Sequence, residues 1–135
     1  MMDTKPLADY LRTQLVDVRE VGAAADFMAA ADGSVSVPAV FVIPQEERVA
    51  EDDFDGEFLL RVVIAVVCVV SNYRDSIGEA AQSDLEKLRC AVKDAIDEFI
   101  PAGAQAPARF MRGGLMSFDA QTMWWADEFE VLLSQ

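Results

Sequence analysis

The hydrophobic pattern is strongest between Phe58 and Val70, where Arg61 is the only charged residue. Seven residues of this run are valine or isoleucine, whose branched side chains lose rotamer freedom in a helix and pack well on a pleated sheet. The run is also shorter than the roughly 20 apolar residues that a helix needs to cross a bilayer. It predicts a strand from Leu60 to Val70 that is buried on both faces, so helices or a neighbouring subunit must cover both.

Helical spacing of apolar residues occurs in three segments. A first helix is predicted from Lys5 to about Val16, and the alanine-rich segment 23–32 predicts a short second helix. A third helix is predicted over 79–100, where Ser76 and Glu79 have the spacing of a capping box. Its apolar stripe consists of Leu85, Leu88, Val92, Ile96 and Phe99.

Shorter apolar runs predict the remaining strands. One lies within 18–22, and another runs from Ala39 to Ile43 between two prolines, which cannot donate to a strand ladder. The acidic segment 45–57 is predicted to be a loop. Residues 109–118 and 123–133 predict an antiparallel pair that turns near Asp119, with a bulge at Gly113 and Gly114 rather than a hairpin turn there.

This order of elements predicts an α+β fold. The chain is interpreted as a single domain over residues 1–135, with a mainly antiparallel sheet and a long central strand. Two main helices and a short third one are expected to pack on that sheet.

Charge limits the kinds of partner. The chain has 24 acidic and 11 basic residues, a net charge of −13, which disfavours binding to nucleic acid phosphates. An acidic surface also suits a channel through which DNA slides without sticking. The N-terminus lacks the apolar core of a signal peptide, and no membrane segment is expected. Cys68 and Cys90 are predicted to be buried free thiols in a reducing cytoplasm.

Catalytic signals are weak along the whole sequence. The chain has no histidine, the commonest general base and transition-metal ligand. It also lacks a nucleophile elbow and a phosphate-binding glycine loop. The carboxylates at 51–55 are the only concentrated group, and they lack the spacing of a calcium loop. We therefore expect no catalytic residue, no metal site and no cofactor.

Two groups of residues are candidates for interaction with other proteins. The first mixes aromatic and acidic side chains, which suits an interface because tryptophan is enriched at interface cores, although tryptophans also pack in protein cores. It consists of Trp124, Trp125, Asp127, Glu128 and Phe129. The second is the acidic loop, whose charges cannot pack unpaired in a core and therefore either dock on a partner or face solvent. It contains Glu46, Glu47, Glu51, Asp52, Asp53 and Asp55.

A family resemblance covers most of the chain. It is carried, in order, by VGAAADFMAAA, PAVFVIP, VVCVVSNYRDSIGEAAQSDLEKLRCAVKDAI and RGGLMSFDAQTMWWADEF. In this order and spacing the sequence resembles the tail terminator proteins of tailed bacteriophages and related prophages. The resemblance implies a structural subunit without an active site. It implies a hexameric ring that caps the end of the tail tube, stops tube polymerisation and presents a surface for head joining.

The same resemblance implies the partners and the location. The expected partners are further copies of the chain, the tail tube protein and a head-tail connector protein. DNA is expected to pass through the bore without sequence-specific binding, and no membrane is involved. The protein is expected in the virion tail after assembly in the host cytoplasm. Two alternatives stay open: another head-tail completion or neck protein, and a carboxylate-based metal-dependent hydrolase, which requires acidic residues that converge in a pocket.

Overall fold

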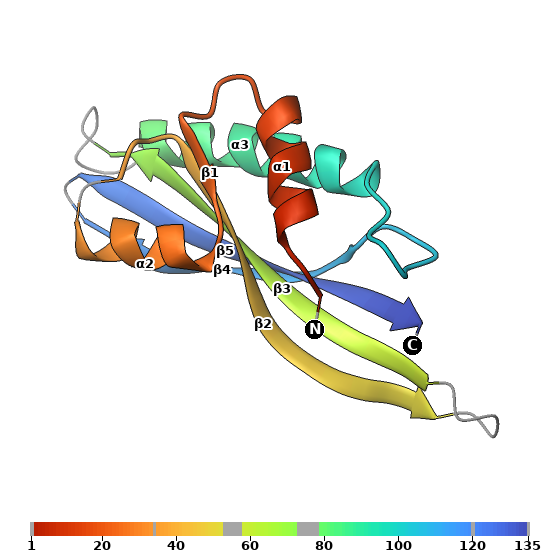
Figure 1. Ribbon diagram of the computed structural model, residues 1–135. Helices are drawn as coiled ribbons and strands as arrows, with labels where there is room; N and C mark the ends of the chain where they lie inside the picture. Colours follow the sequence, from red (N-terminus) through yellow and green to blue (C-terminus); the bar gives the residue numbers. More distant parts are fainter. Residues whose placement is uncertain (1, 34, 53–57, 73–78, 120, 135) are drawn as a thin grey trace.

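The described residues form a five-stranded sheet with three helices, which confirms the predicted α+β class (Figure 1). The computed structural model describes residues 2–33, 35–52, 58–72, 79–119 and 121–134, and the side chains of 51, 52 and 58 are not described. In chain order, the elements are α1 (Lys5–Gln14), β1 (Glu20–Gly22), α2 (Ala24–Asp32), β2 (Ala39–Asp52), β3 (Phe58–Ser71), α3 (Glu79–Asp97), β4 (Arg109–Phe118) and β5 (Thr122–Ser134).

Strand β3 lies at the centre of the sheet, whose order is β1-β2-β3-β5-β4. It pairs antiparallel with β2 and β5, β4 pairs antiparallel with β5, and β1 pairs parallel with β2. Leu60 and every residue from Val62 to Val70 are buried. The prediction of a central strand buried on both faces is therefore confirmed for all of its residues except the partly exposed Arg61.

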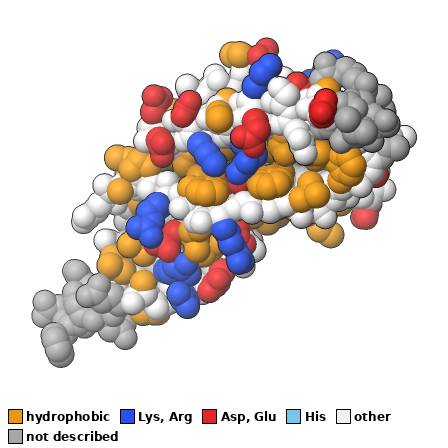
Figure 2. Space-filling view, turned by 180° about the vertical axis from the view of Figure 1, so that it is seen from behind, with side chains coloured by type: hydrophobic (Ala, Val, Ile, Leu, Met, Phe, Trp, Pro, Cys, Tyr) orange, Lys and Arg blue, Asp and Glu red, His pale blue; other side chains and the backbone are white. Residues whose placement is uncertain are grey.

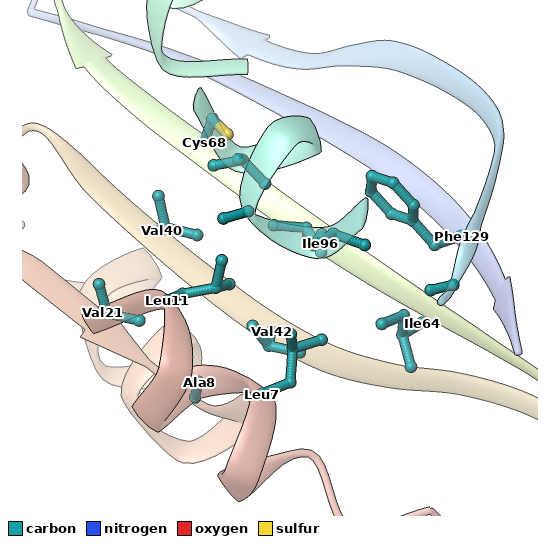
Figure 3. Close-up of a cluster of buried hydrophobic side chains, with 14 of the residues drawn as sticks. Leu7, Ala8, Leu11, Val21, Val40, Val42, Ile64, Cys68, Ile96 and Phe129 are labelled. Carbon is teal, nitrogen blue, oxygen red and sulfur yellow. The ribbon is translucent and has the colours of Figure 1, made fainter. Parts of the chain in front are cut away.

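Helices α1 and α3 cover one face of the sheet (Figure 3). Leu7 and Leu11 of α1 and Ile96 of α3 point onto Val42 and Ile64, which come from neighbouring strands. Each of these side chains is almost fully buried, and burying one such side chain stabilises a fold by about 1.5–3 kcal/mol. This layer forms the larger of the two apolar cores.

Helix α2 covers only part of the opposite face. Its Phe27 lies 5.9 Å from the ring of Phe41 on β2 and 6.0 Å from the ring of Trp124 on β5, both in edge-on geometry. Val67 and Val69 of β3 complete this smaller core. The rest of this face carries charged side chains, and no described helix packs there.

The predicted loop after Ile43 is wrong, because β2 continues as a strand to Asp52. Its backbone pairs with β3, for example Glu46 with Val63 and Glu47 with Val62. Residues 44–52 and their partners on β3 extend away from the helices, and we call residues 44–52 the arm (Figure 1). Of the predicted docking residues, Asp53 and Asp55 lie outside the described part of the chain.

Local conformation explains how the arm forms. Pro44 and Glu46 flank one shift in register, and Val49 and Glu51 flank another, so Gln45 and Ala50 are extra residues of β2. Proline is tolerated at such irregularities and on unpaired edges, where its missing N–H removes no ladder bond.

Strands β4 and β5 form the predicted antiparallel pair. The Asp119 carboxylate accepts hydrogen bonds from the N–H groups of Gln121 and Thr122 at 2.7 and 2.8 Å, which shapes the turn. The bulge predicted at the glycines is wrong in position, because Gly113 and Gly114 pair in regular register and the shifts occur on either side of them. Helix α1 ends two residues earlier than expected, and the capping residue predicted for α3, at position 76, lies outside the described residues.

Candidate interaction surface

Strand β4 forms one edge of the sheet, and all ten of its residues are exposed. Within the described chain, no strand pairs with its outer side. Five of its side chains are large and apolar, with exposed fractions between 37% and 55%: Phe110, Met111, Leu115, Met116 and Phe118. Unpaired backbone groups beside exposed apolar side chains form a template on which another chain can add a strand. Seen from behind, the surface has a broad hydrophobic area bordered by basic side chains (Figure 2).

A buried ion pair holds β5, the strand on which β4 rests. Asp127 is 1% exposed, and both of its carboxylate oxygens accept hydrogen bonds from Arg89 of α3, each at 2.9 Å. Trp125 donates a third hydrogen bond at 2.9 Å, and its ring lies 4.5 Å from the Arg89 guanidinium carbon. The hydrogen bonds from Asp127 raise the pKa of Arg89. This bidentate, charge-assisted contact joins α3 to the sheet and compensates the burial of the carboxylate.

The close approach of β4 to this ion pair requires a glycine. A Cβ atom at Gly113 would lie 2.2 Å from Oδ1 of Asp127 and 2.7 Å from Nε1 of Trp125. A Cβ atom at Gly114 would meet no atom within 4 Å. Only the first glycine is therefore fixed by its surroundings.

A charged band crosses the face that α2 leaves uncovered. Glu128 accepts hydrogen bonds from Arg112 of β4 and, at 2.9 Å, from Gln45 of β2. The hydrogen bond from Arg112 is the main reason why the pKa of Glu128 is lowered. Arg61 of β3 donates to Glu130 at 2.6 Å, and both side chains are less than one fifth exposed. The band links four strands through polar contacts and presents them as one surface.

The structure divides the predicted interface residues between the two faces of the sheet. Trp125, Asp127 and Phe129 lie on the face of α3, whereas Trp124 and Glu128 lie on the face of α2 and the charged band. Asp127 and Phe129 are enclosed within the chain and have no surface to offer a second subunit in this arrangement. An interface role for the other three residues stays a prediction.

The apolar side chains of β4 are the residues that the sequence analysis missed. Their segment RFMRGGLMSF does carry a signal, because it contains two arginines and no carboxylate in a chain that has twice as many acidic as basic residues. Its position at the edge of the sheet depends on strand order, which the segment does not reveal.

The two cysteines differ in environment. Cys68 is buried, and its burial raises the pKa of the thiol to about 12, so the thiol stays protonated at neutral pH. Cys90 is exposed on α3, so its predicted burial is wrong. Among the described residues, no three acidic, histidine or cysteine side chains converge as they would around a metal ion. No helix in the described ranges has the length and apolarity needed to span a membrane.

The fold and its exposed edge define a small α+β subunit with a surface suited to assembly. The sequence matches the model of the phage tail terminator protein family over residues 1–133, so the chain belongs to that family and is a structural component of a phage-type tail.

A solved structure described as the virion of a native gene transfer agent particle contains a similar chain. The two chains are 14% identical, with a TM-score of 0.53, over 96% of this chain and 95% of that one. At this identity the similarity shows a shared fold. No curated protein matches the chain.

Proposed function

We propose that the protein is a terminator subunit that forms a ring on the end of the tail tube. The ring stops tube polymerisation and presents a surface for head joining. Family membership supports the tail location, and the exposed edge strand β4 is the observation that carries the assembly step. The hexameric number follows from the resemblance in sequence.

The conformation of β4 supports self-association, because the entropy of ordering this strand is already lost in the free subunit. The strand is held in an extended conformation by β5, so an incoming strand has to order only itself. A contact between unlike surfaces, repeated from copy to copy, closes into a ring when the rotation between copies divides a full turn.

The remaining partners follow from the same proposal. One side of the ring meets the tail tube protein and the other meets a head-tail connector protein. Its acidic charge keeps DNA from binding as it passes through the bore. We assign contact with the tube to the acidic residues between Glu51 and Asp55, because many charges of one sign steer association with a basic patch.

Electron microscopy of particles made with and without the protein tests this function. We expect particles that lack it to show tails of uncontrolled length and unattached heads, and complementation with the wild-type gene to restore both. Unattached heads beside tails of normal length would instead indicate a neck protein. Normal particles in its absence would contradict both roles.

A further inference from the structure

Within the residues that the structure describes, the sheet has two unpaired edges of opposite character. One is β4, and the other is the outer side of the arm, because β1 pairs only with Ala39, Val40 and Phe41. We propose that β4 of one subunit pairs antiparallel with the arm of the next copy, so that the sheet continues from subunit to subunit. This inference rests on the proposed function, since it gives the ring its subunit contact.

Charge favours this pairing over other strand contacts. Strand β4 contains two arginines and no acidic residue, whereas the arm, PQEERVAED, contains four acidic residues and one arginine. Arg109 has no ion-pair partner among the described residues, and Glu46 has only a 3.9 Å contact with Arg48. Two copies of β4 paired with each other would offer no carboxylate to any of their arginines.

The side chains of the two edges can also be compared by the face of the sheet on which they lie. Arg109 pairs with Glu130 and Glu46 with Val63, and Val63 pairs with Glu130, so the two side chains lie on the same face of the sheet. By the same alternation, Phe110 and Val49 share the face of α1 and α3. An incoming arm would therefore bring Glu46 and Arg48 to the arginine side, and Val49 and Glu47 to the apolar side, so Glu46 and Val49 are the matching residues.

Strand direction gives the same answer. Within one subunit, β4 runs antiparallel to β2, because it is antiparallel to β5 and β5 runs parallel to β2. Copies related by rotation about the ring axis keep the sense in which each strand runs along that axis. The new contact is then antiparallel, which is the slightly more stable ladder.

The offset between the edges fits a closed sheet. Arg48, at the centre of the arm, lies level with Leu132 of β5, whereas Gly114 of β4 lies level with Ala126. This difference of six residues along β5 is about 20 Å, and the repeat of four strands is about 19 Å wide. Aligning the edges requires strands tilted by about 45°, at the upper end of the roughly 35–45° found in barrels.

The direction of this stagger determines which face of the sheet lies on the outside of the ring. Closed sheets with the usual right-handed strand twist have this stagger when α1 and α3 lie on the outside of the ring. The charged band of Arg61, Glu128 and Glu130 then faces the bore.

Cysteine cross-linking in assembled particles tests the contact. In a Cys90→Ser background, Val49→Cys is combined in turn with Phe110→Cys and with Leu115→Cys, since all three positions lie on one sheet face and are at least two fifths exposed. Cys68 is buried and protonated, and does not interfere. We expect at least one pair to give an oxidation ladder of multiples up to six, and each single cysteine to give none. A disulfide between two copies of the variant that carries only Leu115→Cys, or no ladder from either double variant, would overturn the proposal.

A mixing experiment separates this contact from the ring function. The variant Leu115→Asp/Met116→Asp blocks β4, and Val49→Asp/Ala50→Pro blocks the arm at its extra residue. Neither should assemble alone, while their mixture should form dimers and nothing larger, because each retains one intact edge. Leu132→Asp is the control, as this 44% exposed residue lies on β5, away from both edges. If either blocked variant caps tails normally, the pairing is wrong and the terminator function stands. If the mixture forms dimers but the wild-type protein is absent from tail ends, the function is wrong and the pairing stands.

Discussion

Two adjacent glycines of β4 allow a matched test of the structure. The change Gly113→Ala places a methyl group against the buried Asp127, whereas Gly114→Ala places it in open space. The two variants share strand, chemistry and sequence neighbourhood. Any difference between them therefore reports the contact made by the added methyl group.

The cost at Gly113 follows from the distances. The new Cβ atom would lie 2.2 Å from Oδ1 of Asp127, so that oxygen must retreat by about 1 Å to reach an ordinary contact. Such a shift disrupts the 2.9 Å hydrogen bonds that this oxygen accepts from Arg89 and Trp125. Hydrogen bonds to charged groups contribute about 1.5–3 kcal/mol each, so we expect a loss of about 3 kcal/mol. At this chain length the loss corresponds to a fall in Tm of roughly 10 °C.

Thermal unfolding followed by circular dichroism measures both variants beside the wild type. Gly114→Ala should unfold at or slightly above the wild-type temperature, because alanine has about 0.5–1 kcal/mol less conformational freedom to lose than glycine. Equal melting of Gly113→Ala and the wild type would show that β4 does not approach the Arg89–Asp127 pair as described.

Three further predictions concern the core, acid stability and the arm. Ile64→Asp should prevent soluble expression, because an unpaired carboxylate in a core costs several kcal/mol against a total stability of about 5–15 kcal/mol; wild-type solubility and Tm would contradict this. Backbone N–H groups lower the pKa of Asp119, and Arg112 lowers that of Glu128, so their stabilisation is present above pH of about 4–5 and disappears as the pH falls. The Tm of the variant Asp119→Ala/Arg112→Gln should therefore fall less than that of the wild type between pH 6 and 3. The same dependence of Tm on pH in both proteins would refute the role of these two carboxylates. Replacing Glu51, Asp52, Asp53 and Asp55 by serine should leave Tm nearly unchanged but cause a salt-sensitive loss of tail capping, whereas tails of normal length would leave these residues as a solvated surface.

Sequence reasoning succeeded where local pattern and final environment agree. The run around Ile64 is apolar on both sides, and a central strand is the environment in which both sides are buried. The third helix was predictable for a similar reason, because its apolar stripe faces the sheet along its whole length.

The arm was missed because its conformation comes from its partner. Its proline and acidic residues favour a loop by local propensity, but β3 pairs with it as an antiparallel neighbour and supplies the ladder that keeps it extended. For the candidate interface, the burial of Asp127 and Phe129 was not predictable from the sequence. The alternation of side chains along β5 correctly places Trp124 and Trp125 on opposite faces of the sheet. Which face is buried depends on the position of α3, which covers the face that carries Asp127.

Strand β4 also poses a problem of specificity, since an exposed apolar edge can pair with any extended chain. Several features reduce this risk in the free subunit. The two shifts in register interrupt the regular edge, and the two arginines oppose basic or identical strands. The net charge of −13 adds a repulsion between copies that acts only over about 8 Å at physiological salt. A strand that is to pair with β4 must therefore bring carboxylates to the arginine side and small apolar groups to the other. The arm meets these two requirements through Glu46 on the arginine side and Val49 on the apolar side.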